Sequence, residues 1–327
     1  MKKPKVVVIG GGTGTFTVLS GLKQQNIDLI AIVTVADSGG STGRLRDQFG
    51  FLPVGDLRQS LAALARENDQ SWIRELLLYR FCNGEGLKGH NLGNLILTAL
   101  QDLSGSTPRA LEIAGEVFRL EGAILPITDV NVDLVIEYED GTFIIGEDNL
   151  NPEHGGGKRI NKIRLSPRAK IYSRSSEEII GADYIIIGPG DLYASILPNL
   201  VVDGASRAIK RSKAKIIYVV NLMTRYTQTH KYTARDHVEE IKNYMGRYPD
   251  VVIVNSGKIP TNIISKYKKE KGFPVINDLK GKLPFKVVEA SLYMVAKAKN
   301  NKADLLKRSL LLHDSQKLTS ILLDLMR

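Results

Sequence analysis

The chain has 327 residues, of which 43% are apolar and 24% are charged, as in an ordinary globular protein. This composition excludes a wholly disordered or collagen-like chain, and the single cysteine excludes a disulfide scaffold. No apolar run approaches the roughly 18 residues of a membrane span, and the apolar run after Lys5 ends in glycines, unlike a signal peptide. We therefore expect a cytoplasmic enzyme or binding protein with one large or two ordinary domains.

The formal net charge of +10 is unevenly distributed along the chain. Ten lysines lie between Lys266 and Lys302, a pattern that is typical of a solvated surface. Aromatic residues make up only 6% of the chain, which disfavours a stacking surface for nucleic acid. A net positive charge is compatible with binding of nucleic acid, membranes or phosphorylated small molecules, and nucleic acid is the third candidate because only the charge favours it.

The first 35 residues predict a βαβ unit. A buried strand at 5–10 ends in glycines, a helix is expected at 15–25, and a second buried strand at 29–35. Two strands joined by a helix in this way belong to a parallel sheet.

The elements that follow predict a Rossmann-like, mostly parallel doubly wound sheet. Helices are expected at 57–65, 71–81, 92–100, 108–120, 201–212 and 233–246, and further buried strands at 183–188, 215–221 and 251–255. Alternating apolar residues around Asp140-Gly141 predict a hairpin, within a small antiparallel excursion at about 125–172. A C-terminal part at about 260–327 adds short strands and two helices, the last near 315–327.

A glycine-rich turn lies between the first strand and the first helix. It consists of Gly10, Gly11, Gly12, Thr13, Gly14 and Thr15. Glycines let backbone N–H groups approach a phosphate, and a helix N-terminus favours negative charge. The turn matches neither the full dinucleotide fingerprint nor a Walker motif, and a tight turn without ligand is the alternative. If it does bind phosphate, Gly12→Val and Gly14→Val should abolish binding while the protein stays folded.

A second candidate anion-binding loop follows the second strand. It contains Asp37, Ser38, Gly39, Gly40 and Ser41. Arg44 and Arg46 come next, and we expect Arg44 to face the ligand and Arg46 to lie on the surface or in an ion pair. The alternative is a flexible loop that Asp37 caps.

Two further segments offer polar side chains. Asp56 is either the N-cap of the helix from 57 or a metal or base candidate, and Arg58 faces either ligand or solvent. His90, Asn91 and Asn94 lie at a glycine-rich loop before an apolar helix. His90 is either a proton donor, a phosphate ligand or a structural residue.

Polar loops also follow the later strands of the predicted sheet. They contain Gly188, Pro189, Gly190 and Asp191 after one strand, and Asn221 and Thr224 after the next. The carboxyl ends of parallel strands form one edge of a sheet, where ligands bind in open α/β folds. We therefore expect all these loops to converge on one crevice.

These motifs together closely resemble the gluconeogenesis factor family, the YvcK-like proteins, in the superfamily of 2-phospho-L-lactate transferase (CofD-like). The resemblance covers most of the chain through residues 10–15, 37–46, 55–58, 88–94, 188–195 and 221–224. It implies a single CofD-like α/β domain over residues 1–327 that binds UDP-N-acetylglucosamine, as bacterial members do. It also implies a role in gluconeogenic growth, cell shape and cell-wall precursor metabolism.

The sequence departs from the family pattern at three places. Residues 225–229 read Arg-Tyr-Thr-Gln-Thr where Gln-Pro-Gly-Glu-Thr is usual, and Asp191 stands where serine or threonine is common. Asp37-Ser38 carries one aspartate where many members have two, which weakens the case for a metal held by paired acids.

Two functions remain open from the sequence. The first is a nucleotide-sugar-binding regulator, which we favour because no catalytic constellation is evident. The second is a phosphotransferase that uses Mg²⁺ and a nucleoside-diphosphate-linked donor, as the transferase relatives do. Asp37 and Asp56 are then the candidate metal ligands or bases, and His90 is the third catalytic candidate. The sequence does not decide between a monomer and a homo-oligomer.

Overall fold

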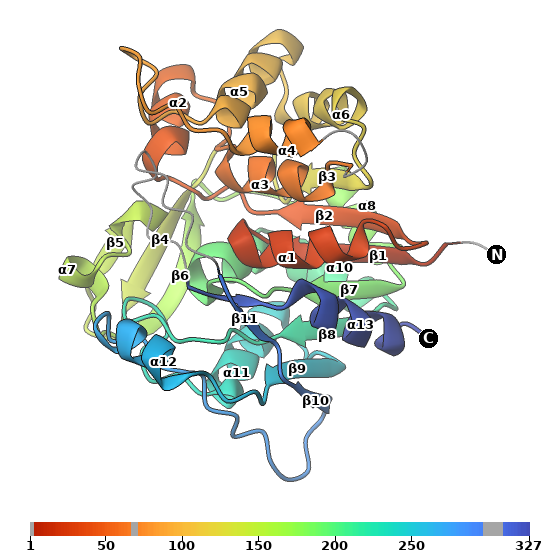
Figure 1. Ribbon diagram of the computed structural model, residues 1–327, viewed down its shortest axis with the longest axis vertical. Coiled ribbons are helices and arrows are strands. Elements are labelled where there is room, and N and C mark those ends of the chain that lie inside the picture. Colours follow the sequence, from red (N-terminus) through yellow and green to blue (C-terminus); the bar gives the residue numbers. More distant parts are fainter. Residues whose placement is uncertain (1–2, 67–70, 297–309) are drawn as a thin grey trace.

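The computed structural model describes residues 3–66, 71–296 and 310–327 (Figure 1). Lys297, Lys299 and Lys302 of the lysine-rich stretch, and part of the expected C-terminal region, lie outside the described residues. Buried apolar side chains from all parts of this chain form one continuous core.

A seven-stranded parallel sheet forms the centre of the described structure, in the order β10-β9-β8-β7-β1-β2-β3. Its strands are β1 (Lys5–Gly10), β2 (Asp28–Val33), β3 (Ala123–Pro126), β7 (Tyr184–Ile187), β8 (Lys215–Val219), β9 (Val251–Asn255) and β10 (Lys286–Ala290). Strand β1 pairs with β2 on one side and β7 on the other, so the strand order reverses there. This is the topological switch point of a doubly wound sheet, where ligands bind.

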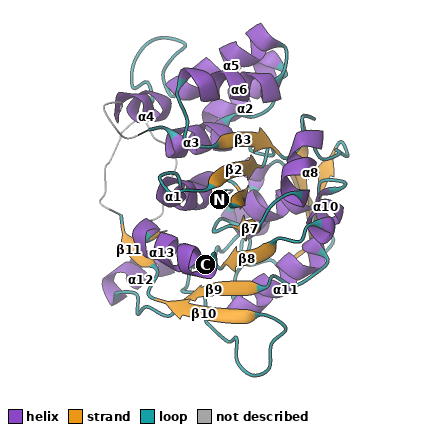
Figure 2. Cartoon of the chain, turned by 90° about the vertical axis from the view of Figure 1, so that its right-hand side faces the viewer, coloured by secondary structure: helices purple, strands orange, loops and turns teal. Residues whose placement is uncertain are grey.

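Helices cover both faces of this sheet, and Figure 2 shows it nearly edge-on between them. One side carries α1 (Gly12–Leu22), α12 (Thr261–Lys268) and α13 (Ser315–Leu325), and the other carries α8 (Ser173–Ile180), α10 (Ala205–Arg211) and α11 (Ala234–Met245). The remaining longer helices are α2 (Gly40–Phe49), α3 (Gly55–Leu64), α4 (Ser71–Leu78), α5 (Leu92–Ser104) and α6 (Thr107–Val117). They gather near β2 and β3 at the top of Figure 1.

A small antiparallel sheet lies beside the carboxyl end of the central sheet, at the left of Figure 1. It has the order β5-β4-β6 and consists of β4 (Asp133–Tyr138), β5 (Phe143–Ile145) and β6 (Ile160–Ser166). A 3₁₀ helix at Glu147–Asn149 and α7 (Pro152–Gly155) connect β5 to β6. Strands β11 (Tyr293–Val295) and β12 (Leu311–His313) form a separate pair near α13.

Apolar side chains and helix caps explain why several of these strands and helices form where they do. Val6, Val7, Val8 and Ile9 of β1 have no exposed surface, as expected for a strand covered on both faces. Helix α11 begins with a capping box in which Thr233 and Asp236 exchange hydrogen bonds between side chain and backbone. Asn91 and Ser106 are the N-caps of α5 and α6, and each side chain accepts a hydrogen bond from one backbone N–H of the first turn.

The predicted fold class is confirmed: the sheet is parallel and Rossmann-like, with a small antiparallel addition. One local expectation was wrong: residues 123–126 form the edge strand β3 of the central sheet, although 125–172 was expected to be antiparallel. Residues 40–49 form helix α2, which begins two residues after Ser38 and ends at Gly50 with φ of 72°. Arg44 and Arg46 therefore lie on a helix.

Candidate functional site

The glycine loop packs directly against the loop that follows β7. A Cβ on Gly14 would overlap the carbonyl group of Pro189, and the side-chain amide of Asn199 donates to the carbonyl oxygen of Gly10 at 3.3 Å. Gly12, with φ of 64°, adopts a backbone conformation that side chains other than glycine rarely take. The expectation that Gly14→Val leaves the fold intact therefore conflicts with this packing, whereas Gly12 faces more open space.

Asp56 lies on the glycine loop. Its carboxylate accepts a hydrogen bond from the backbone N–H of Gly12 and fills the space where a Cβ of Gly11 would stand. The N-cap of α3 is Val54, so Asp56 is not the N-cap that was one of its two expected roles. Its carboxylate instead occupies the N-terminus of α1, the position that a phosphate is expected to take.

Asp37 lies next to Asp56, at the place where the loops after β1, β2, β7 and β8 meet, which we call the crevice. Its Oδ1 accepts a hydrogen bond from the backbone N–H of Gly39 at 3.1 Å, and its carboxylate also accepts one from the side chain of Thr42. Burial raises the pKa of Asp37, while these hydrogen bonds and the charges of Arg58 and Arg46 oppose that rise. Asp37 and Asp56 interact electrostatically, and burial and this repulsion raise the pKa of Asp56 to about 7.

The antiparallel sheet contributes a carboxylate that sequence reasoning missed. Glu147 follows β5, and burial together with the charges of Asp37, Asp56 and Asp191 raises its pKa to about 8. The next residue, Asp148, accepts a hydrogen bond from the hydroxyl of Ser38 at 2.7 Å and so ties this segment to the second loop. No local sequence pattern predicts that Glu147 lies at this site, because the contact that brings its segment there joins Ser38 and Asp148, which are 110 residues apart.

We call Asp37, Asp56, Glu147 and Asp191 the crevice carboxylates. Each is partly exposed, and their mutual repulsion favours a cation or a proton among them. Among the residues that the structure describes, no three acidic, histidine or cysteine side chains are grouped closely enough to hold a metal ion. Mg²⁺ commonly takes only one or two carboxylates and completes its shell with water and substrate phosphates, so Asp37 and Asp56 fit this mode of binding.

His90 and Asn94 belong to a buried polar network behind the crevice. His90 Nδ1 lies 3.2 Å from the hydroxyl of Ser41, and Asn94 donates to Thr42 at 3.2 Å and accepts from Arg58 Nε at 2.7 Å. Burial and the nearby charges of two arginines lower the pKa of His90, which favours its neutral form. The network joins the start of α2 to α3 and α5, so it holds the second loop in place.

The loops after β7 and β8 are also joined. Asn221 Oδ1 accepts from the backbone N–H of Gly190 at 3.1 Å. Thr224 is buried, and its hydroxyl accepts a hydrogen bond from the backbone N–H of Phe273 at 3.0 Å. Asn91 caps α5 through Asn94, so the structure gives Asn91 and Thr224 positions that support the loops.

Three arginines near the crevice take different positions. Arg46 forms an ion pair with Asp133, with Nη1 2.7 Å from Oδ1. Arg44 is exposed and lies beside Gly89, close enough to His90 to affect its pKa. Arg225, which the sequence analysis treated only as a departure from a family pattern, pairs with Asp191 at 3.1 Å.

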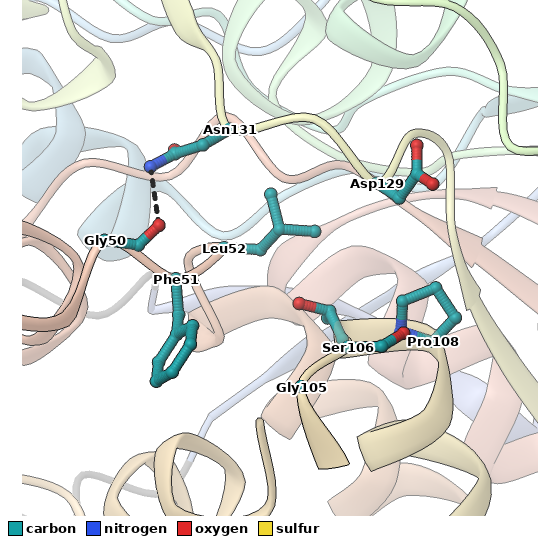
Figure 3. Close-up of a pocket in the computed structure, with 9 residues that line it drawn as sticks. Gly50, Phe51, Leu52, Gly105, Ser106, Pro108, Asp129 and Asn131 are labelled. Carbon is teal, nitrogen blue, oxygen red and sulfur yellow. Dashed lines mark hydrogen bonds between the residues drawn. The ribbon is translucent and has the colours of Figure 1, made fainter. Parts of the chain in front are cut away.

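A separate pocket of about 360 Å³ lies at the end of β3 (Figure 3). Asp129 and Asn131 from the segment after β3 line it together with Leu52 and the turn at 105–108, and Asn131 donates to the carbonyl oxygen of Gly50 at 3.4 Å. Among the described residues that line it, the one charged side chain is that of Asp129. The crevice between β1 and β7 remains the candidate site.

The chain is similar to known proteins over most of its length. A family model described as "2-phospho-L-lactate transferase CofD" matches residues 6–293, which include every loop of the crevice. The chain belongs to the CofD family. Within the described ranges, no helix of this CofD family member is long and apolar enough to cross a membrane.

Several gluconeogenesis factors are similar to this CofD family member. One, from Bacillus subtilis, is 39% identical over 100% of this chain and 99% of its own length. A putative gluconeogenesis factor from Thermotoga maritima is 43% identical over 81% of this chain and 83% of its own. The crystal structure of protein BH3568 from Bacillus halodurans superposes with a TM-score of 0.89 at 37% identity, over 98% of this chain and 100% of that one.

Proposed function

We propose that the protein binds a UDP-sugar of the UDP-N-acetylglucosamine type in the crevice between β1 and β7 and acts as a regulator. The observation that carries this proposal is the junction of the glycine loop with the Gly188–Ser195 loop at the switch point of the sheet. The diphosphate lies at the N-terminus of α1, and the nucleoside and sugar extend along the neighbouring loops. The ligand-binding roles of Gly10–Thr15, Asp37–Ser41, Gly188–Asp191 and Asn221 are part of this proposal.

The similarity to gluconeogenesis factors supports a role in growth on gluconeogenic carbon sources. We further propose that this cytoplasmic regulator senses a cell-wall precursor and links its level to cell shape. A UDP-sugar is the chemical class that connects sugar supply to wall synthesis, and the glycine loop suits its diphosphate.

The crevice carboxylates favour Mg²⁺ as a companion of the ligand. Four carboxylates would repel a diphosphate, and Mg²⁺ held by Asp37 and Asp56 would neutralise both. When bound, Mg²⁺ supplies charge neutralisation of phosphate oxygens. Arg58 adds a fixed positive charge behind these two carboxylates and hydrogen-bonds Asn94.

A phosphotransferase is the second candidate function, and the same carboxylates are the observation that favours it. In that case Asp56, with a pKa of about 7, can take a proton from an acceptor hydroxyl at neutral pH. Bond cleavage would release a nucleotide from the donor.

Two measurements test these alternatives on the full chain. Calorimetry with UDP-N-acetylglucosamine, with and without Mg²⁺, should give saturable binding that Mg²⁺ strengthens. Mass spectrometry of the same mixture should show the UDP-sugar intact if the protein is a regulator. Absence of binding contradicts the proposed function, and release of UMP or UDP favours the transferase.

A further inference from the structure

Arg225 and Asp191 form an ion pair between the loops that follow β8 and β7. Arg225 Nε donates to Asp191 Oδ1 at 3.1 Å, and the two side chains are 39% and 31% exposed. Asp191 lies at the end of the Gly188–Asp191 turn, and Arg225 follows β8. The pair therefore joins the loops of two neighbouring strands at the edge where the ligand is expected.

Both partners are held in place by contacts outside the pair. The loop that carries Asp191 continues into a π-helical turn, where the hydroxyl of Tyr193 lies 2.9 Å from that of Tyr232. The backbone N–H of Arg225 donates to the hydroxyl of Thr229 at 2.9 Å, which closes a turn at 225–229. Since little reorganisation is needed, the charges of the pair are preorganised with respect to a ligand.

The charge of Asp191 reaches the glycine loop. It contributes to the raised pKa of Asp56, whose carboxylate contacts Gly12, and to the raised pKa of Glu147. An uncompensated Asp191 would therefore repel a diphosphate bound at that loop. Arg225 is the cation that the structure places directly on this carboxylate.

We propose that Arg225 and Asp191 are the pair of residues that sets the affinity of the crevice for anions, in which Arg225 attracts the diphosphate and Asp191 limits that attraction. This inference rests on the proposed function in that the anion is the diphosphate of a UDP-sugar. It concerns positions 191 and 225 alone and does not depend on whether turnover occurs. Of the two arginines on α2, Arg46 is paired with Asp133 and Arg44 is exposed beside Gly89.

The two partners should have opposite effects on affinity. Arg225→Gln leaves Asp191 uncompensated and should weaken binding about tenfold, while Asp191→Asn leaves the guanidinium charge and should tighten binding about threefold to tenfold. The double variant should return to within about threefold of the wild type, since both charges are removed. A pair that only ties the two loops together predicts the reverse for Asp191→Asn, which would then weaken binding.

The experiment is calorimetry on the full chain at two salt concentrations, with UDP-N-acetylglucosamine and with inorganic pyrophosphate as probes. Arg174→Gln is the matched control, because Arg174 on α8 forms an ion pair of similar exposure with Glu112 on α6, at 2.6 Å, and neither residue belongs to the loops of the crevice. The control should bind like the wild type, and melting temperatures of all variants show whether they are folded.

Opposite effects of the two single variants on the affinity for either probe support the inference. The higher salt concentration should make both effects smaller. Weaker binding of pyrophosphate by both single variants, or unchanged binding by both, overturns it. If pyrophosphate binds with this pattern but the UDP-sugar does not bind, the proposed function fails and the inference stands. If neither probe binds the wild-type chain, both fail.

Discussion

The carboxylate of Asp56 accepts a hydrogen bond from the backbone N–H of Gly12, so an acidic side chain of α3 occupies the N-terminus of α1. An anion supplied by the protein thus stands where the phosphate of a ligand is expected. A ligand must displace this carboxylate, or bind together with a cation or proton that neutralises it. We therefore expect the Asp56–Gly12 contact to determine how ligand binding responds to Mg²⁺.

The first prediction concerns Asp56→Asn. Removing this charge should tighten UDP-sugar binding about tenfold when Mg²⁺ is absent and should abolish most of the gain that Mg²⁺ gives the wild type. Calorimetry with and without Mg²⁺ measures both effects. Asp102→Asn, an exposed aspartate on α5, is the control and should change neither. Equal Mg²⁺ dependence in Asp56→Asn and wild type would exclude Asp56 as a metal ligand.

The second prediction concerns pH and Glu147. The pKa of Glu147 rises from an ordinary 4.5 to about 8 on folding, so between these pH values the folded protein holds a proton that the unfolded chain releases. The free energy of unfolding therefore falls as pH rises from about 4.5 to about 8, because the folded protein must give up this proton and hold a charged Glu147. Glu147→Gln should stabilise the protein by about 1–3 kcal/mol at pH 9 and by little at pH 5.

Urea unfolding at pH 5, 7 and 9 measures this difference in the free energy of unfolding. Glu153→Gln on α7, an exposed glutamate of the same connecting segment, is the matched control. A stabilisation by Glu147→Gln that is the same at all three pH values would show that the carboxylate is not protonated in the folded protein.

The third prediction separates two glycines of the loop. Gly12→Val places a side chain at a φ of 64° but meets few atoms, so it should cost about 1–2 kcal/mol of stability and remove ligand binding. In Gly14→Val the side chain overlaps the backbone of Pro189, so the melting temperature should fall much further. Thermal unfolding and calorimetry together decide this, and equal melting temperatures would contradict the packing argument.

The fourth prediction ranks Arg44 and Arg46. Arg44→Ala should weaken UDP-sugar binding because the exposed guanidinium is expected to contact the ligand. The loss of one charge-assisted contact lowers affinity by roughly 10- to 150-fold. Arg46→Ala should change affinity less and stability by about 1 kcal/mol, because its ion pair with Asp133 is lost. If Arg44→Ala lowers the melting temperature and keeps full affinity, Arg44 is structural.

The fold could be predicted from sequence because its signals are local. The apolar run at Val6–Ile9 followed by glycines requires a buried strand and a turn, and 28–33 repeats the first part of that pattern. The starts of α5 and α11 have recognisable caps in Asn91 and Thr233. Such patterns depend on neighbours within a few residues, which a sequence displays directly.

The acidic half of the site could not be predicted in the same way. Glu147 enters the crevice because the β4-β5-β6 sheet folds back on the carboxyl end of the central sheet, and no spacing in the sequence encodes that placement. Asp56 has the pattern of a helix cap but turns toward Gly12, since tertiary contact outweighs a local capping preference. The roles of Asp37 and His90 in ligand binding stay predictions.

The central position of β1 has a consequence for how the chain is made. Val6 pairs with Tyr184, so one edge of this apolar strand stays unpaired until more than half of the chain has been synthesised. An open apolar strand edge readily pairs with other chains, and parallel sheets with distant partners form slowly. A nascent chain of this protein should therefore depend on chaperones until β7 is translated, and fragments that end before residue 184 should aggregate and not fold.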